Sequence, residues 1–507
     1  MTRSNGSPHR LFIFGWDCAD WTVIEEGWRR GMLPHLRAVQ ERGESGILMS
    51  TIPPVTAPAW TTFLTGKDPG EHGIFGFRTV DPSDYRPVMV PGGQRRSSTL
   101  FRQLDATGYR TCLVTVPWTY PPEALTGSAI VPGWDAPDES LESCYPAHVR
   151  AGLAKVVERV PRRSPRRSSA PRFLERQRQN VALRERICTH LIATTKPNVF
   201  MVVFPEPDQA THLFWGTTRV PESLLQAYQA VDDAMGRLIS QFVKAEDRVL
   251  VLSDHGARPI HTYVHVGKVL LDAGFLAATS NGDRGVRVAR GMKRSVWYRL
   301  PPPARKALLQ RMPRSARRRA SLVVRGTQVD WRRTRAFPSD QGPGLGVVIN
   351  GRPQFPAGPV SASEYETVRQ DVAALLRALT EPESGEPMFS DVLPREDVYQ
   401  GPEVASAPDL LLVPAPGYGT EGGLDFTKRT SRVAIGGHRR EGVFVANWGL
   451  GLGSVADIRD LLPRALDSCG FELRNLAESQ RDESPEGYSK REAEEMETRL
   501  RELGYIE

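Results

Sequence analysis

Three short apolar runs, each followed within two residues by an acidic side chain, constrain the fold of this chain more than any other feature. They are LFIFG at residues 11–15, NVFMVVF at 198–204 and RVLVLS at 248–253. A continuous apolar run of this length is typical of a strand buried on both faces, as in parallel sheets. Asp17 and Asp254 therefore stand at the carboxyl ends of strands, where open α/β sheets bind their ligands.

Segments with helical character alternate with these runs. Residues 222–243 place apolar side chains such as Leu224, Tyr228 and Val231 on one helical face, and residues 34–43 end at a glycine. Further strands are predicted at 46–50, 110–116, 346–350, 409–413 and 442–447, and further helices at 363–379, 457–466 and 489–503. Strands that alternate with helices predict an α/β fold, with a mainly parallel, doubly wound sheet that is flanked by helices.

The alternation is lost between about residues 271 and 335, where Gly, Pro and Arg dominate. We interpret this part as an insertion, or cap, over the site. Residues 1–270 and 336–470 are then expected to form the two halves of the core, and 471–507 a charged helical tail. Substrate specificity in such folds depends on loops and insertions, so it is expected to reside in this cap and in the loop after residue 116.

Composition excludes several classes of protein. The five cysteines are scattered without a C-x-x-C pair, which argues against a disulfide scaffold or a cysteine zinc site and favours a reducing compartment. No apolar run approaches the roughly 20 residues that span a bilayer, and the N-terminal MTRSNGSPHR lacks the apolar stretch of a secretory signal. We therefore expect a cytoplasmic location and no transmembrane segment.

The net charge of +7 is modest for this length but is unevenly placed. Two arginine-rich runs stand out, PRRSPRRSSAPR at residues 161–172 and PRSARRRA at 313–320. Such runs are usually solvated loops, and the sharper alternative is that they bind nucleic acid, anionic lipid or an anionic substrate. Our prediction is a small anionic partner and no specific nucleic acid. The sequence does not indicate the oligomeric state.

Two interpretations are open for STIPPVTAPAWTTFLTGKDPGEHGIFG at residues 50–76, and the sharper of them is a phosphate-binding turn. This stretch predicts a strand end, a Pro-Pro turn and a short apolar helix with Thr56 at its mouth. The N–H groups of a first helical turn lack intrahelical partners and favour anions, so Thr56 would present a hydroxyl to a phosphate. The plainer alternative is that Thr56 only caps the helix, which is a common role for threonine.

Side chains that commonly bind metals gather at the predicted strand ends. The candidates are Asp17, Asp208 with His212, Asp254 with His255, and His438. Imidazole and carboxylate together suit zinc, manganese or iron, whereas a calcium or magnesium site would be nearly all oxygen. Each of these residues, taken alone, could be a structural cap or an ordinary loop residue. Their joint occurrence with Thr56 favours a site.

These stretches resemble the alkaline phosphatase superfamily and, within it, the type I phosphodiesterase/nucleotide pyrophosphatase family. The matching motifs are GWDCAD, PPVTAPAWTTFLTGKDPGEHGIFGF, EPDQATH, SDHG and GGHRREGVF, in the family's order from residue 11 to about 450. The resemblance implies two divalent metals, Zn²⁺ with Mn²⁺ or Fe as alternatives. The implied ligands of the first are Asp208, His212 and His438, and those of the second are Asp17, Asp254 and His255.

By the same resemblance Thr56 is the nucleophile, and water releases a phospho-threonine (or nucleotidyl-threonine) intermediate. Two cations roughly 4 Å apart suit such an in-line displacement. Family members that act on nucleotides commonly carry Asn three residues after the nucleophile, where this chain has Ala59. Backbone N–H groups or an arginine would have to replace that contact. Trp60 is either a wall of the leaving-group pocket or a core residue.

Three further histidines complete the candidates. His72 belongs to the motif but is interpreted as structural, and His261 and His265 are weak candidates for substrate contacts. A sulfatase is not favoured, because Cys144-Tyr145-Pro146-Ala147-His148 lacks the arginine of the sulfatase motif. A phosphoglycerate mutase of the superfamily would use serine and different spacing.

The sequence therefore predicts a metal-dependent hydrolase of phosphodiester or pyrophosphate bonds. Its substrate would be a small anionic phosphoester such as a nucleotide, a nucleotide-sugar or a lipid headgroup. A phosphomonoesterase or phosphotransferase of the same superfamily is the first alternative. A metal-binding module without catalysis is the second, and retention of all seven candidate residues argues against it.

Overall fold

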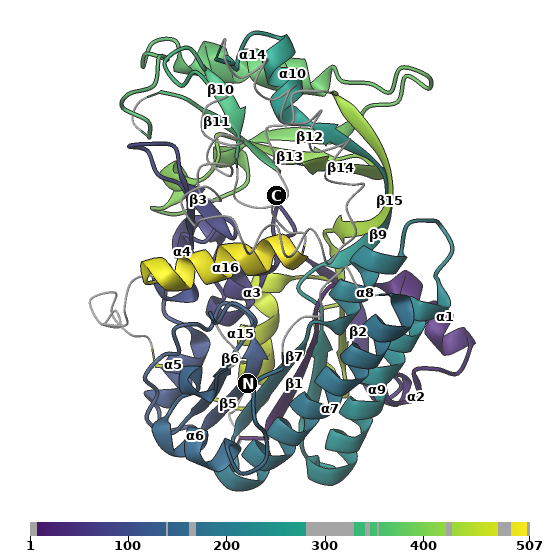
Figure 1. The fold of residues 1–507 in the computed structure, drawn as a ribbon. Coiled ribbons are helices and arrows are strands. Elements are labelled where there is room, and N and C mark those ends of the chain that lie inside the picture. Colours follow the sequence, from purple (N-terminus) through teal and green to yellow (C-terminus); the bar gives the residue numbers. More distant parts are fainter. Residues whose placement is uncertain are drawn as a thin grey trace, which may run out of the picture.

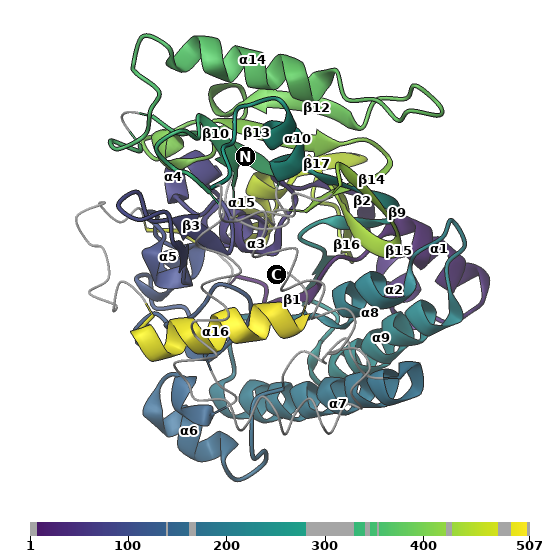
Figure 2. The same ribbon diagram turned by 45° about the horizontal axis from the view of Figure 1, so that its top comes forward.

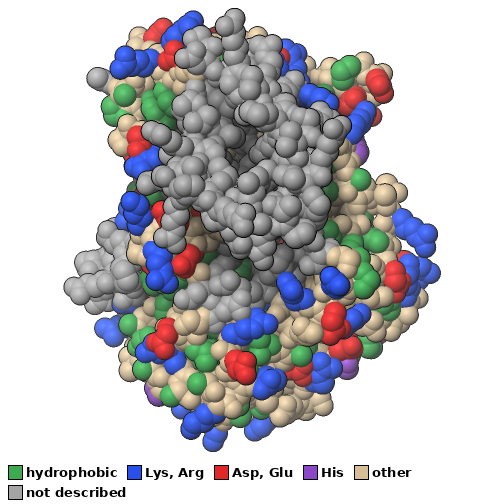
Figure 3. Space-filling view, viewed as in Figure 1, with side chains coloured by type: hydrophobic (Ala, Val, Ile, Leu, Met, Phe, Trp, Pro, Cys, Tyr) green, Lys and Arg blue, Asp and Glu red, His purple; other side chains and the backbone are tan. Residues whose placement is uncertain are grey.

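The structure is a computed structural model that describes residues 8–137, 140–161, 169–279, 329–339, 345–351, 354–421, 428–474 and 488–503. The arginines of both basic runs up to residue 168 and from 313 to 320 lie outside the described residues. On the face seen in Figure 3, Lys and Arg side chains are interspersed with Asp and Glu. Among the described helices, none combines the length and the apolar character that a bilayer-spanning segment needs.

The core is one eight-stranded sheet. Its strands, in spatial order, are β17 (Val455–Asp457), β2 (Glu44–Met49), β16 (Glu441–Ala446), β8 (Arg248–Leu252), β1 (Leu11–Trp16), β7 (Val199–Phe204), β5 (Thr111–Val116) and β6 (Ala129–Pro132). β16 runs antiparallel to both of its neighbours, and the other pairs are parallel. The mainly parallel sheet predicted from the apolar runs is confirmed.

Helices cover both faces of this sheet because side chains alternate along each strand. Phe12 and Phe14 of β1 belong to one hydrophobic cluster, and Leu11 and Ile13 to another. The first cluster packs under α1 (Trp21–Arg29), α2 (Pro34–Gln40), α6 (Ala147–Leu153), α7 (Ala170–Thr195), α8 (Glu206–Phe214) and α9 (Glu222–Phe242). The second packs under α3 (Thr56–Thr65), α5 (Leu100–Asp105) and α15 (Ile458–Ser468). The result is a three-layer, doubly wound α/β core (Figure 1).

A second, smaller body sits above the core in Figure 1 and has a hydrophobic cluster of its own. It contains an antiparallel sheet in the order β10 (Ala336–Pro338), β11 (Gly346–Ile349), β13 (Leu410–Pro414) and β12 (Phe389–Pro394), with α10 (Val266–Asp272) and α14 (Tyr365–Arg377). A three-stranded sheet in the order β14 (Gly417–Glu421), β9 (Gly256–His265) and β15 (Thr430–Arg439) connects this body to the core.

This second body changes the domain division expected from the sequence. Residues 336–414 do not continue the core sheet, because β10 to β13 form the separate sheet, and the chain rejoins the core only at β16. Of the expected cap at 271–335, residues 280–328 lie outside the described residues, and the described residues on either side, such as Leu276 and Val329, belong to the second body. The difference arises because β11 and β13 are as buried as core strands, so their apolar patterns do not reveal which sheet they join.

The charged C-terminal helix is observed as α16 (Lys490–Leu503), which crosses the front of the molecule in Figure 2. Its apolar side chains Met496 and Leu500 are buried in a cluster that also contains Val55 and Ala57, the neighbours of Thr56. The tail is thus packed against the turn that precedes α3.

Candidate active site

The seven predicted residues converge at one edge of the core sheet. Asp17 directly follows β1, Asp208 lies in the first turn of α8 after β7, and Asp254 follows β8. These three strands are neighbours in the sheet, so their carboxyl ends meet. His438 arrives from β15, whose pairing with β9 places it opposite Ala257, two residues after His255.

Asp208, His212 and His438 form the first group. Asp208 Oδ1 lies 3.2 Å from the Nε2 atom of each histidine, and the two Nε2 atoms are 2.9 Å apart. The Nδ1–H of His212 donates to the carbonyl oxygen of Gly436 (2.9 Å), and that of His438 to the carbonyl oxygen of Pro54 (3.0 Å). These bonds fix both rings with Nε2 toward the carboxylate, the usual orientation of metal-binding imidazoles.

Asp17, Asp254 and His255 form the second group, and all three side chains are buried. One ligand atom from each lies within 4.8 Å of those of the other two. His255 Nε2 is 3.2 Å from Asp254 Oδ2, and that oxygen accepts no hydrogen bond from the described residues. Burial raises the pKa of Asp254 to about 7 and lowers the pKa of His255 well below its ordinary value. A buried charge without a counter-charge is unfavourable, so this donor set suits a cation.

Thr56 is the first residue of α3 and is fully buried. The N-cap is Val55, which provides no side-chain hydrogen bond, so Thr56 does not serve as the cap. Its hydroxyl oxygen lies 3.5 Å from His255 Nε2 and so faces the second group. The N–H groups at the start of a helix are available to an anion at the same place.

Two supporting networks were not predicted from the sequence. The Arg184 guanidinium on α7 donates to both Glu206 carboxylate oxygens (3.0 Å each) and to Thr115 Oγ1 (2.8 Å), and both charged side chains are fully buried. Glu206 is the first residue of α8, the helix that carries Asp208. The ion pair between Arg184 and Glu206 therefore fixes the start of this helix. The position of Glu206 within the EPDQATH motif could have pointed to it. The sequence gives no indication that its partner is Arg184, which lies on a distant helix.

Asp20 provides the second network. Its Oδ2 atom accepts from the Ala257 N–H (3.1 Å) and from Arg439 Nε (2.7 Å). Ala257 on β9 lies two residues after His255, and Arg439 on β15 directly follows His438. Asp20 therefore ties both of these strands to the loop that follows Asp17.

The weaker substrate candidates Trp60, His261 and His265 belong to neither group. Trp60 is fully buried in the core, and a Cβ on Gly15 would lie 2.6 Å from its ring. Its burial favours the core role over a wall of the leaving-group pocket. His261 lies four residues beyond Ala257 on β9, roughly 13 Å along the strand. His265 is buried in the three-stranded sheet, with Nε2 2.6 Å from Ser431 Oγ.

His72 is a buried structural histidine, as predicted. Its Nδ1 accepts the Ile74 N–H (3.1 Å), so the neutral ring donates Nε2–H to Thr62 Oγ1 (2.9 Å). Burial, and then the nearby Arg95 charge, lower the pKa of His72 from 6.5 to about 3. The ring is therefore neutral in the folded chain at every pH at which the protein is expected to work.

This histidine predicts a pH dependence of stability. The unfolded chain gains a proton on His72 as the pH falls below 6.5, and the folded chain gains it only near pH 3. The free energy of unfolding should therefore decrease across this window, by about 2 kcal/mol between pH 6.5 and pH 5. Urea unfolding at several pH values measures it. In His72→Asn, whose amide oxygen can accept the same N–H, this contribution should vanish, whereas it should persist in the control His148→Asn. An unchanged slope in His72→Asn would contradict the prediction.

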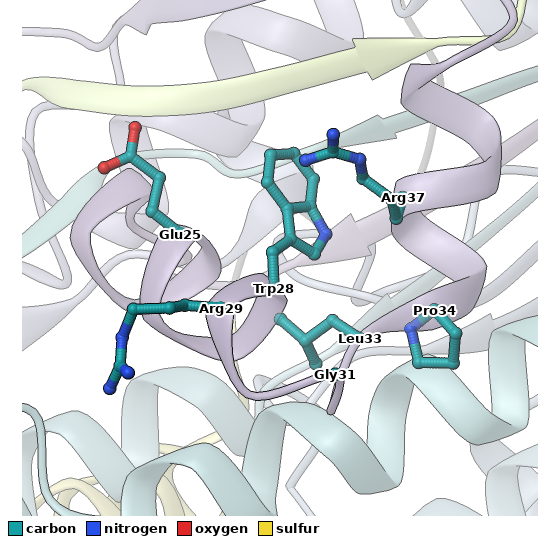
Figure 4. A pocket seen from close by; sticks show the side chains of 7 residues that line it. All are labelled: Glu25, Trp28, Arg29, Gly31, Leu33, Pro34 and Arg37. Carbon is teal, nitrogen blue, oxygen red and sulfur yellow. The ribbon is translucent and has the colours of Figure 1, made fainter.

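A cavity of about 460 Å³ between α1 and α2 is lined by residues that include Glu25, Leu33 and Arg37. Figure 4 shows the Arg37 guanidinium beside the Trp28 ring, at 4.9 Å from guanidinium carbon to ring centroid. None of the seven predicted site residues lines this cavity. It is therefore separate from the candidate active site.

Comparisons with known proteins agree with the fold. The model of a family described as type I phosphodiesterase / nucleotide pyrophosphatase matches residues 11–432. No curated protein sequence matches the chain. Among solved structures, phosphonoacetate hydrolase from Sinorhizobium meliloti 1021 in complex with phosphonoformate is 15% identical, with 91% of this chain and 96% of that chain covered and a TM-score of 0.58.

The same hydrolase in complex with phosphonoacetate gives 14% identity, the same coverage of 91% and 96%, and a TM-score of 0.57. Inactive murine ectonucleotide pyrophosphatase / phosphodiesterase 5 in complex with AMP is 11% identical, with 92% of this chain and 97% of that chain covered and a TM-score of 0.51. At such identities these likenesses establish a shared fold alone.

Proposed function

The chain belongs to the type I phosphodiesterase / nucleotide pyrophosphatase family of hydrolases, in the alkaline phosphatase superfamily, and on that premise we propose a metal-dependent mechanism with a phospho-threonine intermediate. The observation that carries the proposal is the position of Thr56 Oγ1. It lies at the start of α3 and 3.5 Å from His255, beside two groups of three potential ligands.

The donor sets fit divalent cations. Two histidines and a carboxylate would hold one ion, and two carboxylates and a histidine the other, which suits Zn²⁺ with Mn²⁺ or Fe as alternatives. The buried Asp254 Oδ2, which accepts no hydrogen bond from the described residues, supports this assignment. When bound, the cations would neutralise phosphoryl charge and make a hydroxyl or a water easier to deprotonate.

The chain's own groups account for the bond changes. Thr56 loses its hydroxyl proton to solvent, and its Oγ1 forms a bond to phosphorus as the bond to the leaving oxygen breaks. The leaving oxygen takes up a proton from solvent. Water then cleaves the phospho-threonine and restores the hydroxyl. The N–H groups of Thr56 and Ala57 at the start of α3 would bind a phosphoryl oxygen, in the role that Asn plays where this chain has Ala59.

The proposed substrate is a small phosphodiester or pyrophosphate, such as a nucleotide, a nucleotide-sugar or a headgroup. The ligands named for the structural neighbours are two phosphonates, phosphonoacetate and phosphonoformate, and the phosphomonoester AMP. They share with the proposed substrate a small size and a phosphorus oxyanion. A cytoplasmic location is proposed as well, and the five free, buried cysteines are compatible with it.

Hydrolysis of a bis-aryl phosphodiester, measured beside that of the matching monoester, tests the proposal. Both are assayed with metal-stripped, zinc-loaded and manganese-loaded protein. Metal-dependent cleavage with preference for the diester is expected. Preference for the monoester would favour the phosphomonoesterase alternative, and bound metal without release of phenol would favour a binding module.

His438→Ala should weaken metal binding while leaving the fold intact. This side chain supplies one of three donors to the first group and lies on the edge of the site, so its loss should lower affinity for one of two Zn²⁺ ions by at least about 100-fold. Isothermal titration with Zn²⁺ measures it. The matched control is His261→Ala, because His261 lies on the paired strand β9 outside both groups. Two unchanged high-affinity sites in His438→Ala would contradict the ligand assignment.

A further inference from the structure

Cys18 occupies an unusual position between the two groups. It follows Asp17 directly, it is fully buried, and its backbone φ of 61° lies in the left-handed region. A β-carbon makes this conformation costly, and glycine would adopt it with little strain. Of the five cysteines, all described, Cys18 alone has a positive φ. The chain therefore places a thiol where backbone conformation by itself favours glycine.

The Cys18 sulfur lies beside the candidate metal centre, where its thiol donates to a backbone carbonyl. Its N–H donates to Asp254 Oδ1 (3.1 Å), and its Sγ is 3.5 Å from the carbonyl oxygen of Gly256. One ring nitrogen of His255 and one of His438 lie within 4.8 Å of Sγ and of each other. These two histidines belong to different groups, and their rings stack with centroids 3.9 Å apart. The sulfur thus lies where the two groups meet.

A second observation marks the same place as a ligand site. Asp254, whose Oδ1 accepts the Cys18 N–H, is fully buried, and its Oδ2 accepts no hydrogen bond from the described residues. The Cys18 backbone thus orients a carboxylate that has one oxygen left for a cation.

We infer that the Cys18 sulfur is a further ligand at the metal centre, positioned between both groups, and that it biases the centre toward zinc-like ions. This inference rests on the proposed function, because it assumes that the two groups hold cations. Thiolate is a soft ligand that favours Zn²⁺ over Mn²⁺, whereas carboxylates and water are ligands that suit Mn²⁺. On coordination the thiol proton leaves to solvent and a sulfur–metal bond forms, as for other cysteine ligands.

Substitution with Co²⁺ tests the inference directly. A sulfur ligand gives an intense near-ultraviolet charge-transfer band, and imidazole and carboxylate ligands give only the weaker visible bands. Metal-stripped full-length protein is titrated with Co²⁺ alone, together with Cys18→Ser, Cys18→Gly and the control Cys469→Ser. The glycine variant relieves the left-handed strain, so a failure to fold is not expected to obscure the result.

The expected result is both kinds of band in the unaltered chain and in Cys469→Ser, and only visible bands in the two Cys18 variants. Visible bands without the near-ultraviolet band in the unaltered chain would overturn the inference and leave the proposed metal centre in place. Persistence of that band in the Cys18 variants would also overturn it. If the unaltered chain gives no bands at all, the metal centre fails, and the proposed function with it.

Competition between metals provides the second measurement. Cys18→Gly should lower Zn²⁺ affinity by at least about tenfold, and Mn²⁺ affinity should stay within about threefold of the original value. Chelator competition measures both constants. An equal loss for both ions would show that Cys18 acts only through packing and would overturn the proposed bias.

Discussion

Thr56→Ala is expected to lower turnover of an aryl phosphodiester by roughly 10⁴- to 10⁶-fold, as removal of a nucleophile does in other covalent hydrolases. The reason is that the Oγ1 atom faces the second group from the start of α3, where the proposed phospho-threonine would form. The measurement is kcat with zinc-loaded protein, accompanied by a determination of metal content. The metal content should be largely unchanged, because all six residues of the two groups remain in place.

The matched control is Thr65→Ala on the same helix. Thr65 is also buried, but its hydroxyl donates to the carbonyl oxygen of Thr61 (2.7 Å) and not toward the site. This variant should keep most of the activity. Mass spectrometry of acid-quenched protein should detect an aryl-phosphoryl group on Thr56 in the unaltered chain, because one aryl ester of the diester stays on phosphorus. Undiminished turnover in Thr56→Ala would exclude it as the nucleophile.

Arg184→Met is expected to lower the free energy of unfolding by about 3–5 kcal/mol, the usual cost of breaking a fully buried ion pair. The variant leaves the Glu206 carboxylate without the two hydrogen bonds that it accepts from the guanidinium, and it leaves Thr115 Oγ1 without its donor. Chemical denaturation measures the change. Because Glu206 begins α8, metal affinity of the group that contains Asp208 should fall as well.

Two further variants separate the causes. In Arg184→Met combined with Glu206→Gln, part of the lost stability should return, because no unpaired charge remains buried. The control is Arg237→Met. It removes the exposed ion-pair partner of Glu185, which lies on α7 as Arg184 does, and it should lower the free energy of unfolding by less than about 1 kcal/mol. If Arg184→Met costs as little as Arg237→Met, the buried pair does not hold α8.

Six of the eight core strands, and the helices α2, α3, α9 and α15, were predicted from the sequence because their signals are local, whereas β6, β17, α1 and α5 were not. The apolar runs that contain Leu11, Val199 and Val249 form β1, β7 and β8, and the helical periodicity beginning at Glu222 forms α9. A strand buried on both faces needs apolar side chains on both, and that pattern is visible within a few residues. For the same reason, the positions of Asp17 and Asp254 at strand ends can be predicted from the residues that immediately precede them.

Strand β9 is an element that the local sequence did not predict. The sequence analysis predicts no strand directly after His255, yet residues Gly256–His265 form a long strand. This strand pairs with β14 and β15, which lie more than 150 residues later. Partner choice of this kind depends on the packing of a second body, and no pattern within the strand specifies it.

The sequence by itself therefore determined the α/β class, the family motifs and the seven candidate residues. Only the tertiary structure decided which of them meet: His438 lies 226 residues from His212, yet their Nε2 atoms are 2.9 Å apart. It also decided that Trp60 is a core residue, that Arg184 is the partner of Glu206, and that Cys18 lies between the groups. The physical reason is that burial and periodicity are properties of short segments, whereas these contacts arise from strand register and the packing of segments distant in the chain.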